Sequence, residues 1–255
     1  SSDLFVEKEI KNWLKIHCPQ DGFLGEESGT QMPDARVLWV VDPIDGTSCF
    51  LNGLHTWCLS LAIVADGEPV IGVVYDPNHR ELFHALRGHG AWLNDAPIRP
   101  HPAATVREGV MGVGTSHRVT PADFLPFLQA LLSDGGMFIR NGSGALMSAW
   151  AAAGRLIGYY EPHMNPWDAL PGLVLGRPLA RYLRPAALLA ARRRLLAGNG
   201  GATGLAVLTA EGSRLSGHMR VTAEGGHVLI LRPPSAPSHG EALENLRRRA
   251  ATLVP

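Results

Sequence analysis

The chain has 255 residues and a mass of 27.4 kDa, enough for one large domain or two small ones around a substantial hydrophobic core. Hydrophobic residues make up 45% and charged residues 18%, a composition that excludes an intrinsically disordered chain and a coiled coil. Lys and Arg together number 23, as do Asp and Glu, so no net charge draws the protein to nucleic acid or to an anionic membrane.

The three cysteines, Cys18, Cys49 and Cys58, are too few for a secreted disulfide scaffold, and their number is odd. We therefore expect free thiols. No apolar run reaches the roughly 18 residues that a membrane span needs, and the first residues lack the order of a signal peptide. These observations predict a cytoplasmic protein without a membrane partner.

The first half of the chain begins with a helix and continues mainly with strands. Apolar residues at helical spacing predict a helix over 4–16. The β-branched, apolar run 37–41 predicts a buried strand that ends at Asp42. Two further apolar strands, 58–65 and 69–75, are separated by Asp66-Gly67, a pair of residues typical of a hairpin turn.

In the second half, helices alternate with strands. The predicted elements are a helix from Pro121 to Asp134-Gly135-Gly136, a strand over 137–140, a helix over 145–153, a strand over 156–160, a helix from Asn165-Pro166, and a last helix after Ser238. This order predicts a mixed α/β protein. We place the join near 97–102, which gives an N-terminal α+β domain over 1–102 and a C-terminal α/β domain over 103–255.

Three acidic clusters carry the chemistry of the sequence. Gly25-Glu26-Glu27-Ser28 follows a glycine-containing loop, Asp42-Pro43-Ile44-Asp45-Gly46-Thr47 follows the buried strand, and Trp167-Asp168 begins a helix. Asp42 and Asp45 are three residues apart, so both carboxylates can point at one place. Their repulsion is usually relieved by a bound cation, and hard oxygen ligands suit Mg²⁺ or Mn²⁺. An ordinary Asx turn at Asp42 and a solvated loop at Glu26 remain the alternatives.

The run 39–50 (WVVDPIDGTSCF), with GEES before it and WDALPG (167–172) after it, resembles the inositol monophosphatase family of Mg²⁺-dependent, lithium-sensitive phosphatases. The resemblance extends from about Asp3 to Leu175. It implies the sugar-phosphatase fold, a layered αβαβα sandwich. It also implies a site at the junction of the two domains, with two or three Mg²⁺ ions.

The resemblance also implies residue roles. The implied metal ligands are Glu26, Asp42, the backbone carbonyl of Ile44, Asp45 and Asp168. Glu26 and Thr47 match the pair that activates the nucleophilic water, and Asp45 is counted with them as catalytic. The implied substrate-binding residues are Gly46, Thr47, Gly142, Ser143 and Glu161.

The sequence departs from the family pattern at several places. Some forty residues that family chains carry before the segment matching Ser1 are absent here, so the matching acid Asp3 has no evident partner. Pro171 lies one turn after Asp168, removes a backbone donor, and could kink the helix and displace Asp168. Beyond about residue 175 the family pattern is lost. There, the Arg-rich segment 177–194 is open to three interpretations: a patch for polyanions such as RNA, a solvated helix face, or a diverged region.

The activity that follows is hydrolysis of a small phosphate monoester, with inositol monophosphate as the default substrate. Histidinol phosphate, fructose 1,6-bisphosphate and 3′-phosphoadenosine 5′-phosphate compete within the enzyme class. The alternative from another class is a catalytically impaired homologue that binds a partner. A small-molecule phosphate ester is the expected partner; nucleic acid is not expected, and a homodimer is left open.

Overall fold

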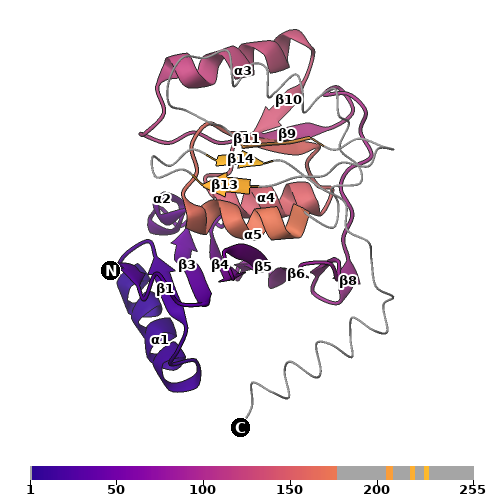
Figure 1. The fold of residues 1–255 in the computed structure, drawn as a ribbon. Coiled ribbons are helices and arrows are strands. Elements are labelled where there is room, and N and C mark those ends of the chain that lie inside the picture. The colour runs from indigo at the N-terminus through magenta and orange to yellow at the C-terminus, as the bar shows by residue number, and fades with distance from the viewer. Residues whose placement is uncertain (1, 177–204, 209–218, 222–226, 230–255) are drawn as a thin grey trace.

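The computed structural model describes residues 2–176, 205–208, 219–221 and 227–229. Most of the described part consists of two β-sheets with helices on their faces (Figure 1). The predicted last helix after Ser238 and the Arg-rich segment 177–194 lie outside the described residues. The predicted division at about residue 102 falls in the connection between the two sheets and stays a prediction.

The first sheet has eight strands in the order β2-β1-β3-β4-β5-β6-β7-β8. Only β1 and β3 pair in parallel; the other neighbours are antiparallel. Its strands are β1 (Gly22–Gly25), β2 (Gly29–Gln31), β3 (Val37–Asp45), β4 (Cys58–Ala65), β5 (Glu68–Asp76), β6 (Glu81–Leu86), β7 (Ala91–Leu93) and β8 (Ala96–Pro97).

The second sheet has the order β10-β9-β11-β12, with only β11 and β12 antiparallel. Its strands are β9 (Val110–Val113), β10 (Met137–Ile139), β11 (Gly158–Glu161) and β12 (Leu205–Leu208); β13 (Met219–Val221) and β14 (His227–Leu229) pair separately. The helices are α1 (Ser2–His17), α2 (Thr47–Leu51), α3 (Pro121–Ser133), α4 (Gly144–Ala152) and α5 (Pro166–Gly176).

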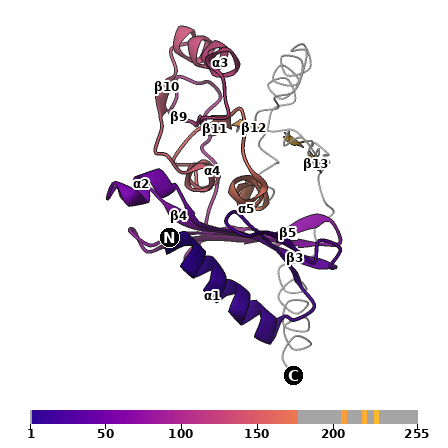
Figure 2. The ribbon, with the colours of Figure 1, turned by 90° about the vertical axis from the view of Figure 1, so that its left-hand side faces the viewer.

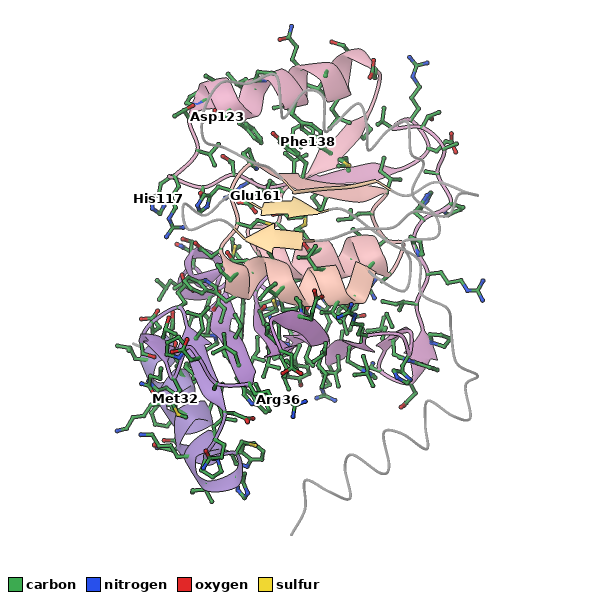
Figure 3. All side chains as sticks on the ribbon, in the orientation of Figure 1. Met32, Arg36, His117, Asp123, Phe138 and Glu161 are labelled. Atoms are coloured by element: carbon green, nitrogen blue, oxygen red, sulfur yellow. The ribbon has the colours of Figure 1, made fainter. Side chains whose placement is uncertain are left out.

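The layers follow one another in a simple order. Figure 2 shows α1 on one face of the first sheet and α4 and α5 on the other, with the second sheet beyond them and α3 outermost. Asp123 lies at the start of α3 (Figure 3). Its carboxylate accepts from the Thr120 backbone N–H at 3.2 Å, so the helix begins where the capping pattern predicts.

Most elements predicted from the sequence are confirmed, with ends within a few residues. The hairpin turn is confirmed because Asp66 and Gly67 both have positive φ, 51° and 76°. The segment before Glu26 is a correction: it is the strand β1, paired with β3, and not a glycine-containing loop. The short strands β6 to β9 and the helix α2 were not predicted.

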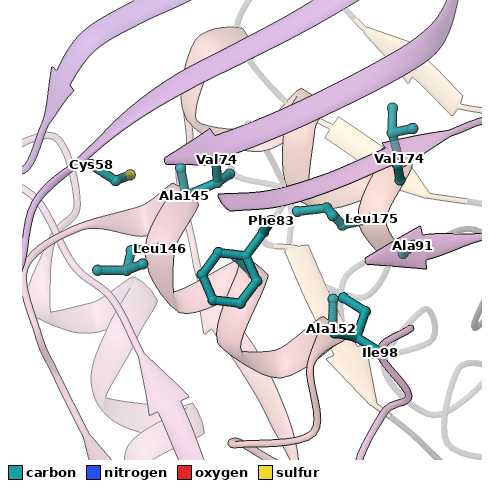
Figure 4. Packing of buried hydrophobic residues seen from close by; sticks show 12 residues of the cluster. Cys58, Val74, Phe83, Ala91, Ile98, Ala145, Leu146, Ala152, Val174 and Leu175 are labelled. Carbon is teal, nitrogen blue, oxygen red and sulfur yellow. The ribbon is translucent and has the colours of Figure 1, made fainter. Parts of the chain in front are cut away.

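The core between the first sheet and helices α4 and α5 holds the site in place. Phe83 and Val74 of the sheet are fully buried against Leu146 of α4 and Val174 of α5 (Figure 4). At Gly72 of β5, α5 approaches so closely that an added Cβ would lie 2.6 Å from the Pro171 carbonyl oxygen. The middle of α5 is thereby held close to the sheet that carries the acidic motif.

Candidate metal centre

The end of β3 places two carboxylates on the same side of the sheet. Asp42 pairs with Ser60, and Asp45 pairs with Cys58. The two aspartates are three residues apart in β3, whereas their partners are two residues apart in β4, so β3 contains one extra residue. In a regular strand, residues three apart point to opposite faces; the extra residue of this bulge removes that alternation. The Ile44 N–H donates to Asp42 Oδ1 at 2.9 Å, which is an Asx turn. The Asx turn, which was an alternative to an acidic site at Asp42, therefore occurs together with that site.

Asp45 is oriented by the start of α4. Its Oδ2 atom accepts hydrogen bonds from Ser143 Oγ at 2.6 Å and from the Ala145 N–H at 2.7 Å. The same Ser143 oxygen caps α4 by accepting from the Leu146 N–H at 3.1 Å. Burial raises the pKa of Asp45, and these hydrogen bonds oppose the rise. One serine thus links the bulge of β3 to α4.

Asp168 brings the third carboxylate from the first turn of α5. Its Oδ2 accepts from the Asn165 N–H at 3.2 Å and from Asn165 Nδ2 at 3.3 Å. One oxygen from each of Asp42, Asp45 and Asp168 lies within 4.8 Å of the others, and we call these residues the Asp triad. Pro171 therefore does not keep Asp168 from the triad.

Glu26 lies beside the triad, at the end of β1. Its N–H donates to the Val41 carbonyl at 3.3 Å, which extends the β1–β3 pairing by one residue. Unlike the triad, Glu26 is exposed. Burial, followed by the charges of Asp45, Glu26 and Asp168, raises the pKa of Asp42 to about 11, and a hydrogen bond with Glu26 adds to this. The Glu26 carboxylate therefore lies within reach of Asp42.

The triad has no cationic partner among the side chains that the structure describes: none of the ion pairs there involves Asp42, Asp45 or Asp168. Burial and the neighbouring carboxylates hold the pKa of Asp168, like that of Asp42, far above its ordinary value. Buried carboxylates without a counter-charge are costly, and a divalent cation with oxygen ligands removes the cost. The triad fits such an ion by its donor atoms.

Thr47 stands at the start of α2, directly after the bulge. Its hydroxyl donates to the Ile44 carbonyl at 3.1 Å and lies 3.5 Å from Asp3 Oδ2. The expectation that Asp3 lacks a partner is therefore wrong: Asp3 is buried in α1 and its carboxylate faces Thr47. The Ile44 carbonyl, an expected ligand, is in contact with this hydroxyl.

Gly46 stands directly before α2, and Gly142 lies two residues before α4. Gly46 has a φ of 95°, and a Cβ there would lie 3.1 Å from the Thr56 carbonyl oxygen and 3.3 Å from Ser143 Cβ. Gly142 has a φ of 101°, and a Cβ there would overlap Cys49 Sγ. Both positions therefore require glycine, because positive φ and crowding act together.

Glu161 occupies a separate position at the end of β11 (Figure 3). It is outside the Asp triad and accepts a hydrogen bond from the Tyr159 hydroxyl. Burial raises the pKa of Glu161 to about 7, while the Tyr159 hydrogen bond opposes the rise. A Cβ at Gly114 would overlap both side chains, and one at Gly144 would lie 3.3 Å from the carboxylate. The carboxyl group is thus closely surrounded.

Two serines at the site were not predicted in the roles they have. Ser143 was expected in a substrate pocket, and its hydroxyl is instead engaged with Asp45. Ser60 was not singled out at all, although a serine within the apolar strand 58–65 is a signal of a buried hydrogen bond. It donates to the Trp167 carbonyl, next to Asp168.

Comparison with known proteins gives the family. A family model described as the inositol monophosphatase family matches residues 1–177, more than two thirds of the chain. The chain therefore belongs to the inositol monophosphatase family, a family of phosphomonoesterases.

Individual relatives fall under two names. The chain is 39% identical over 183 residues to a Nus factor SuhB of Xylella fastidiosa, covering 71% of this chain and 66% of that protein. It is 37% identical over 182 residues to an inositol-1-monophosphatase of Rhizobium meliloti, covering 69% and 67%. The chain thus spans about two thirds of the length of these relatives.

Solved structures agree with the fold. The extragenic suppressor protein SuhB from Bartonella henselae matches with a TM-score of 0.66 and 35% identity, covering 69% of this chain and 68% of that one. Inositol monophosphatase from Anabaena matches with a TM-score of 0.63 and 34% identity, covering 68% and 70%. Within the described residues, no helix has the length and apolar character to cross a membrane.

Proposed function

We propose that this chain catalyses Mg²⁺-dependent hydrolysis of a small phosphate monoester by a metal-activated water, on the αβαβα sugar-phosphatase fold. The observation that carries the proposal is the Asp triad: three ligand oxygens within 4.8 Å, with no cationic side chain paired to them in the described part of the chain. Inositol monophosphate is the first substrate to test. Histidinol phosphate, fructose 1,6-bisphosphate and 3′-phosphoadenosine 5′-phosphate are the others.

Two or three ions would be held by the triad together with Glu26 and the Ile44 carbonyl. When bound, Mg²⁺ lowers the pKa of the attacking water and stabilises the leaving alkoxide; Mn²⁺ can take the same ligands. Asp42 takes part in both halves of the site because it belongs to the triad and forms a hydrogen bond with Glu26.

The protein's own groups would orient the water and the phosphate. Thr47 already donates to the Ile44 carbonyl, so its oxygen is free to accept a hydrogen bond from a water that Glu26 also contacts. The N–H groups of Gly46 and Thr47 lie at the start of α2, where no preceding helical carbonyl is available to accept from them. A phosphate oxygen is a suitable acceptor there.

The leaving group would lie between the triad and Glu161. Glu161, when ionised, would accept hydrogen bonds from ring hydroxyls, and the turn from Gly142 through Ser143, which bonds Asp45, to Gly144, beside Glu161, would line the space between the two acids. The expectation of lithium sensitivity belongs to this proposal. So does a cytoplasmic location.

A phosphate-release assay over the four substrates, with Mg²⁺ and with EDTA, tests the proposal. Release that requires Mg²⁺, and that is lost in Asp45→Asn but kept in the exposed control Asp95→Asn, supports it. Equal release in EDTA, or none on any monoester, contradicts it.

A second candidate is a catalytically impaired homologue that acts by binding a partner. The observation that favours it is the division of the relatives between the names Nus factor SuhB and inositol-1-monophosphatase. Family membership alone therefore does not decide between a phosphatase and a protein that acts by binding a partner. A protein that binds metal through the triad yet releases no phosphate from any monoester would agree with this candidate.

A further inference from the structure

Pro171 leaves a backbone carbonyl of α5 without its helical donor. In an α-helix the N–H of each residue donates to the carbonyl four residues earlier, so residue 171 would serve Trp167. Proline has no N–H to donate. The carbonyl without its helical partner is therefore that of Trp167, the residue directly before Asp168.

Ser60 supplies the missing donor from the first sheet. Its hydroxyl donates to the Trp167 carbonyl oxygen at 2.5 Å, a bond between residues 107 positions apart in the chain. Ser60 is fully buried. A buried hydroxyl in an apolar strand needs a partner, and so does a carbonyl that a helix leaves unpaired. Each group satisfies the other.

Both residues that form this bond are direct neighbours of members of the Asp triad. Ser60 of β4 is the direct cross-strand partner of Asp42 in β3. Trp167 is covalently joined to Asp168. The bond therefore connects the strand-borne part of the triad to the helix-borne part, within one residue of a triad member on each side.

We propose that Ser60 is a positioning residue for Asp168, and that its hydroxyl takes over the role of the N–H that Pro171 lacks. This rests on the proposed function in treating Asp168 as a metal ligand. It extends that function by naming a residue that touches neither metal nor substrate and sets the geometry of the helix-borne part of the triad. Ser60 and Pro171 then act as a pair.

Because Ser60 and Pro171 affect the same carbonyl, substituting both residues distinguishes a positioning role of Ser60 from a purely structural one. Ser60→Ala removes the hydroxyl that donates to the Trp167 carbonyl. Pro171→Ala adds a backbone N–H in helical position to serve the same carbonyl. In the double variant the new N–H replaces the lost hydroxyl, so the two substitutions should be strongly non-additive.

Ser148 offers a matched control on the neighbouring helix. It is a buried serine of α4 that packs against α5 at Gly172, where an added Cβ would lie 2.5 Å from Ser148 Cβ. Its hydroxyl has no hydrogen-bond partner in the described part of the chain. Ser148→Ala therefore removes a hydroxyl near α5 without removing a bond.

The experiment is a Mn²⁺ titration of the full chain without substrate, by calorimetry, for the wild type and these four variants. We expect Ser60→Ala to weaken the lower-affinity Mn²⁺ site about tenfold, and Ser148→Ala and Pro171→Ala to change it less than threefold. Ser60→Ala/Pro171→Ala should return to within about threefold of Pro171→Ala. In the phosphate-release assay, Ser60→Ala should raise the metal concentration needed for half-maximal activity. It should change kcat at saturating metal by a smaller factor.

Two results overturn the inference: Ser60→Ala matching Ser148→Ala, or a double variant no better than Ser60→Ala. If Ser60→Ala alone fails to fold, the comparison moves to the Pro171→Ala background, where adding Ser60→Ala must leave folding and Mn²⁺ affinity intact. Expected Mn²⁺ affinities without phosphate release contradict the proposed function but support this inference. Phosphate release with equal affinities in all variants supports the function and contradicts the inference.

Discussion

The two parts of the Asp triad are built in different ways. Asp42 and Asp45 come from one bulged strand end, and each is held by nearby hydrogen bonds, from the Ile44 N–H and from Ser143. Asp168 comes from a helix more than 120 residues later, and α5 is held on the sheet by packing and by the bond from Ser60 to Trp167. The strand-borne part should therefore be preformed, whereas the helix-borne part depends on how α5 packs on the sheet.

The largest expected effect comes from the strand-borne part. Asp45→Asn removes the charge of a proposed metal ligand and places an amide where Ser143 and the Ala145 N–H now donate. We expect phosphate release to fall by at least two orders of magnitude while the fold is retained. Circular dichroism and the phosphate assay check this, with Asp95→Asn as the control. Near wild-type turnover in Asp45→Asn would contradict the assignment of the triad.

Removing the serine that orients Asp45 should have an intermediate effect. Ser143→Ala loses the hydrogen bond to Asp45 and the cap of α4 together. We expect about a tenfold loss of activity, and a loss of roughly 1 kcal/mol in the free energy of unfolding, typical of a lost N-cap. Chemical denaturation and the phosphate assay measure the two effects. The exposed Ser133→Ala, at the end of α3, should change neither.

Glu161 lies outside the triad, so its loss should affect substrate binding more than chemistry. Glu161→Ala is expected to raise KM for a polyol phosphate about tenfold, because ring hydroxyls lose an acceptor. For p-nitrophenyl phosphate, whose leaving group has no hydroxyls to bind, KM should change less than twofold. Equal changes for both substrates would remove Glu161 from the pocket.

The last expected effect is on the stability of the metal-free protein and not on its activity. The pKa of Asp42 is about 11 in the folded chain and about 3.9 in an unfolded one, so the folded state binds the proton more tightly. This contribution to stability is complete below pH about 4 and is lost as the pH rises toward 11. In EDTA, the melting temperature should therefore fall between pH 6 and pH 9.

Asp42→Asn should reduce that fall, because the amide carries no charge at any of these pH values. With these pKa values the loss is about 1.4 kcal/mol per pH unit, or about 4 kcal/mol between pH 6 and pH 9, and each 1 kcal/mol corresponds to about 2–4 °C in a protein of this size. Thermal melts of the wild type and Asp42→Asn at both pH values, with the exposed Asp95→Asn as control, measure it. Parallel pH profiles for wild type and Asp42→Asn would show that Asp42 is not buried as an uncompensated carboxyl.

The contrast between the two parts also explains what the sequence could predict. The strand-borne part was predictable, because Asp42 and Asp45 are neighbours in the chain and their chemistry is local. The helices and the β4–β5 hairpin followed from periodicity and turn residues. Strands β7 to β9 are too short for a periodic signal, and the six residues of β6 (ELFHAL) do not alternate between apolar and polar. Strand β1 was missed because Gly22 and Gly25 are poor strand formers.

Both parts of the site also depend on long-range contacts that no local pattern encodes. Family resemblance indicated Asp168, but not that Pro171 would be compensated from another element. The bond from Ser60 to Trp167 joins residues 107 apart, and the bond from Ser143 to Asp45 joins residues 98 apart. Such pairs are fixed by the packing of α4 and α5 on the sheet. They could be recognised only once the fold was known.

A Mn²⁺ titration of the wild type, Asp42→Asn and Asp168→Asn tests the two-part site most directly. The account predicts two phases in the wild type, the weaker in the millimolar range. Asp168→Asn should lose the weaker phase and keep the stronger one, since the strand-borne ligands and Glu26 remain, whereas Asp42→Asn should lose both. Loss of both phases in Asp168→Asn, or no Mn²⁺ binding by the wild type, would contradict a preformed strand-borne half completed by α5.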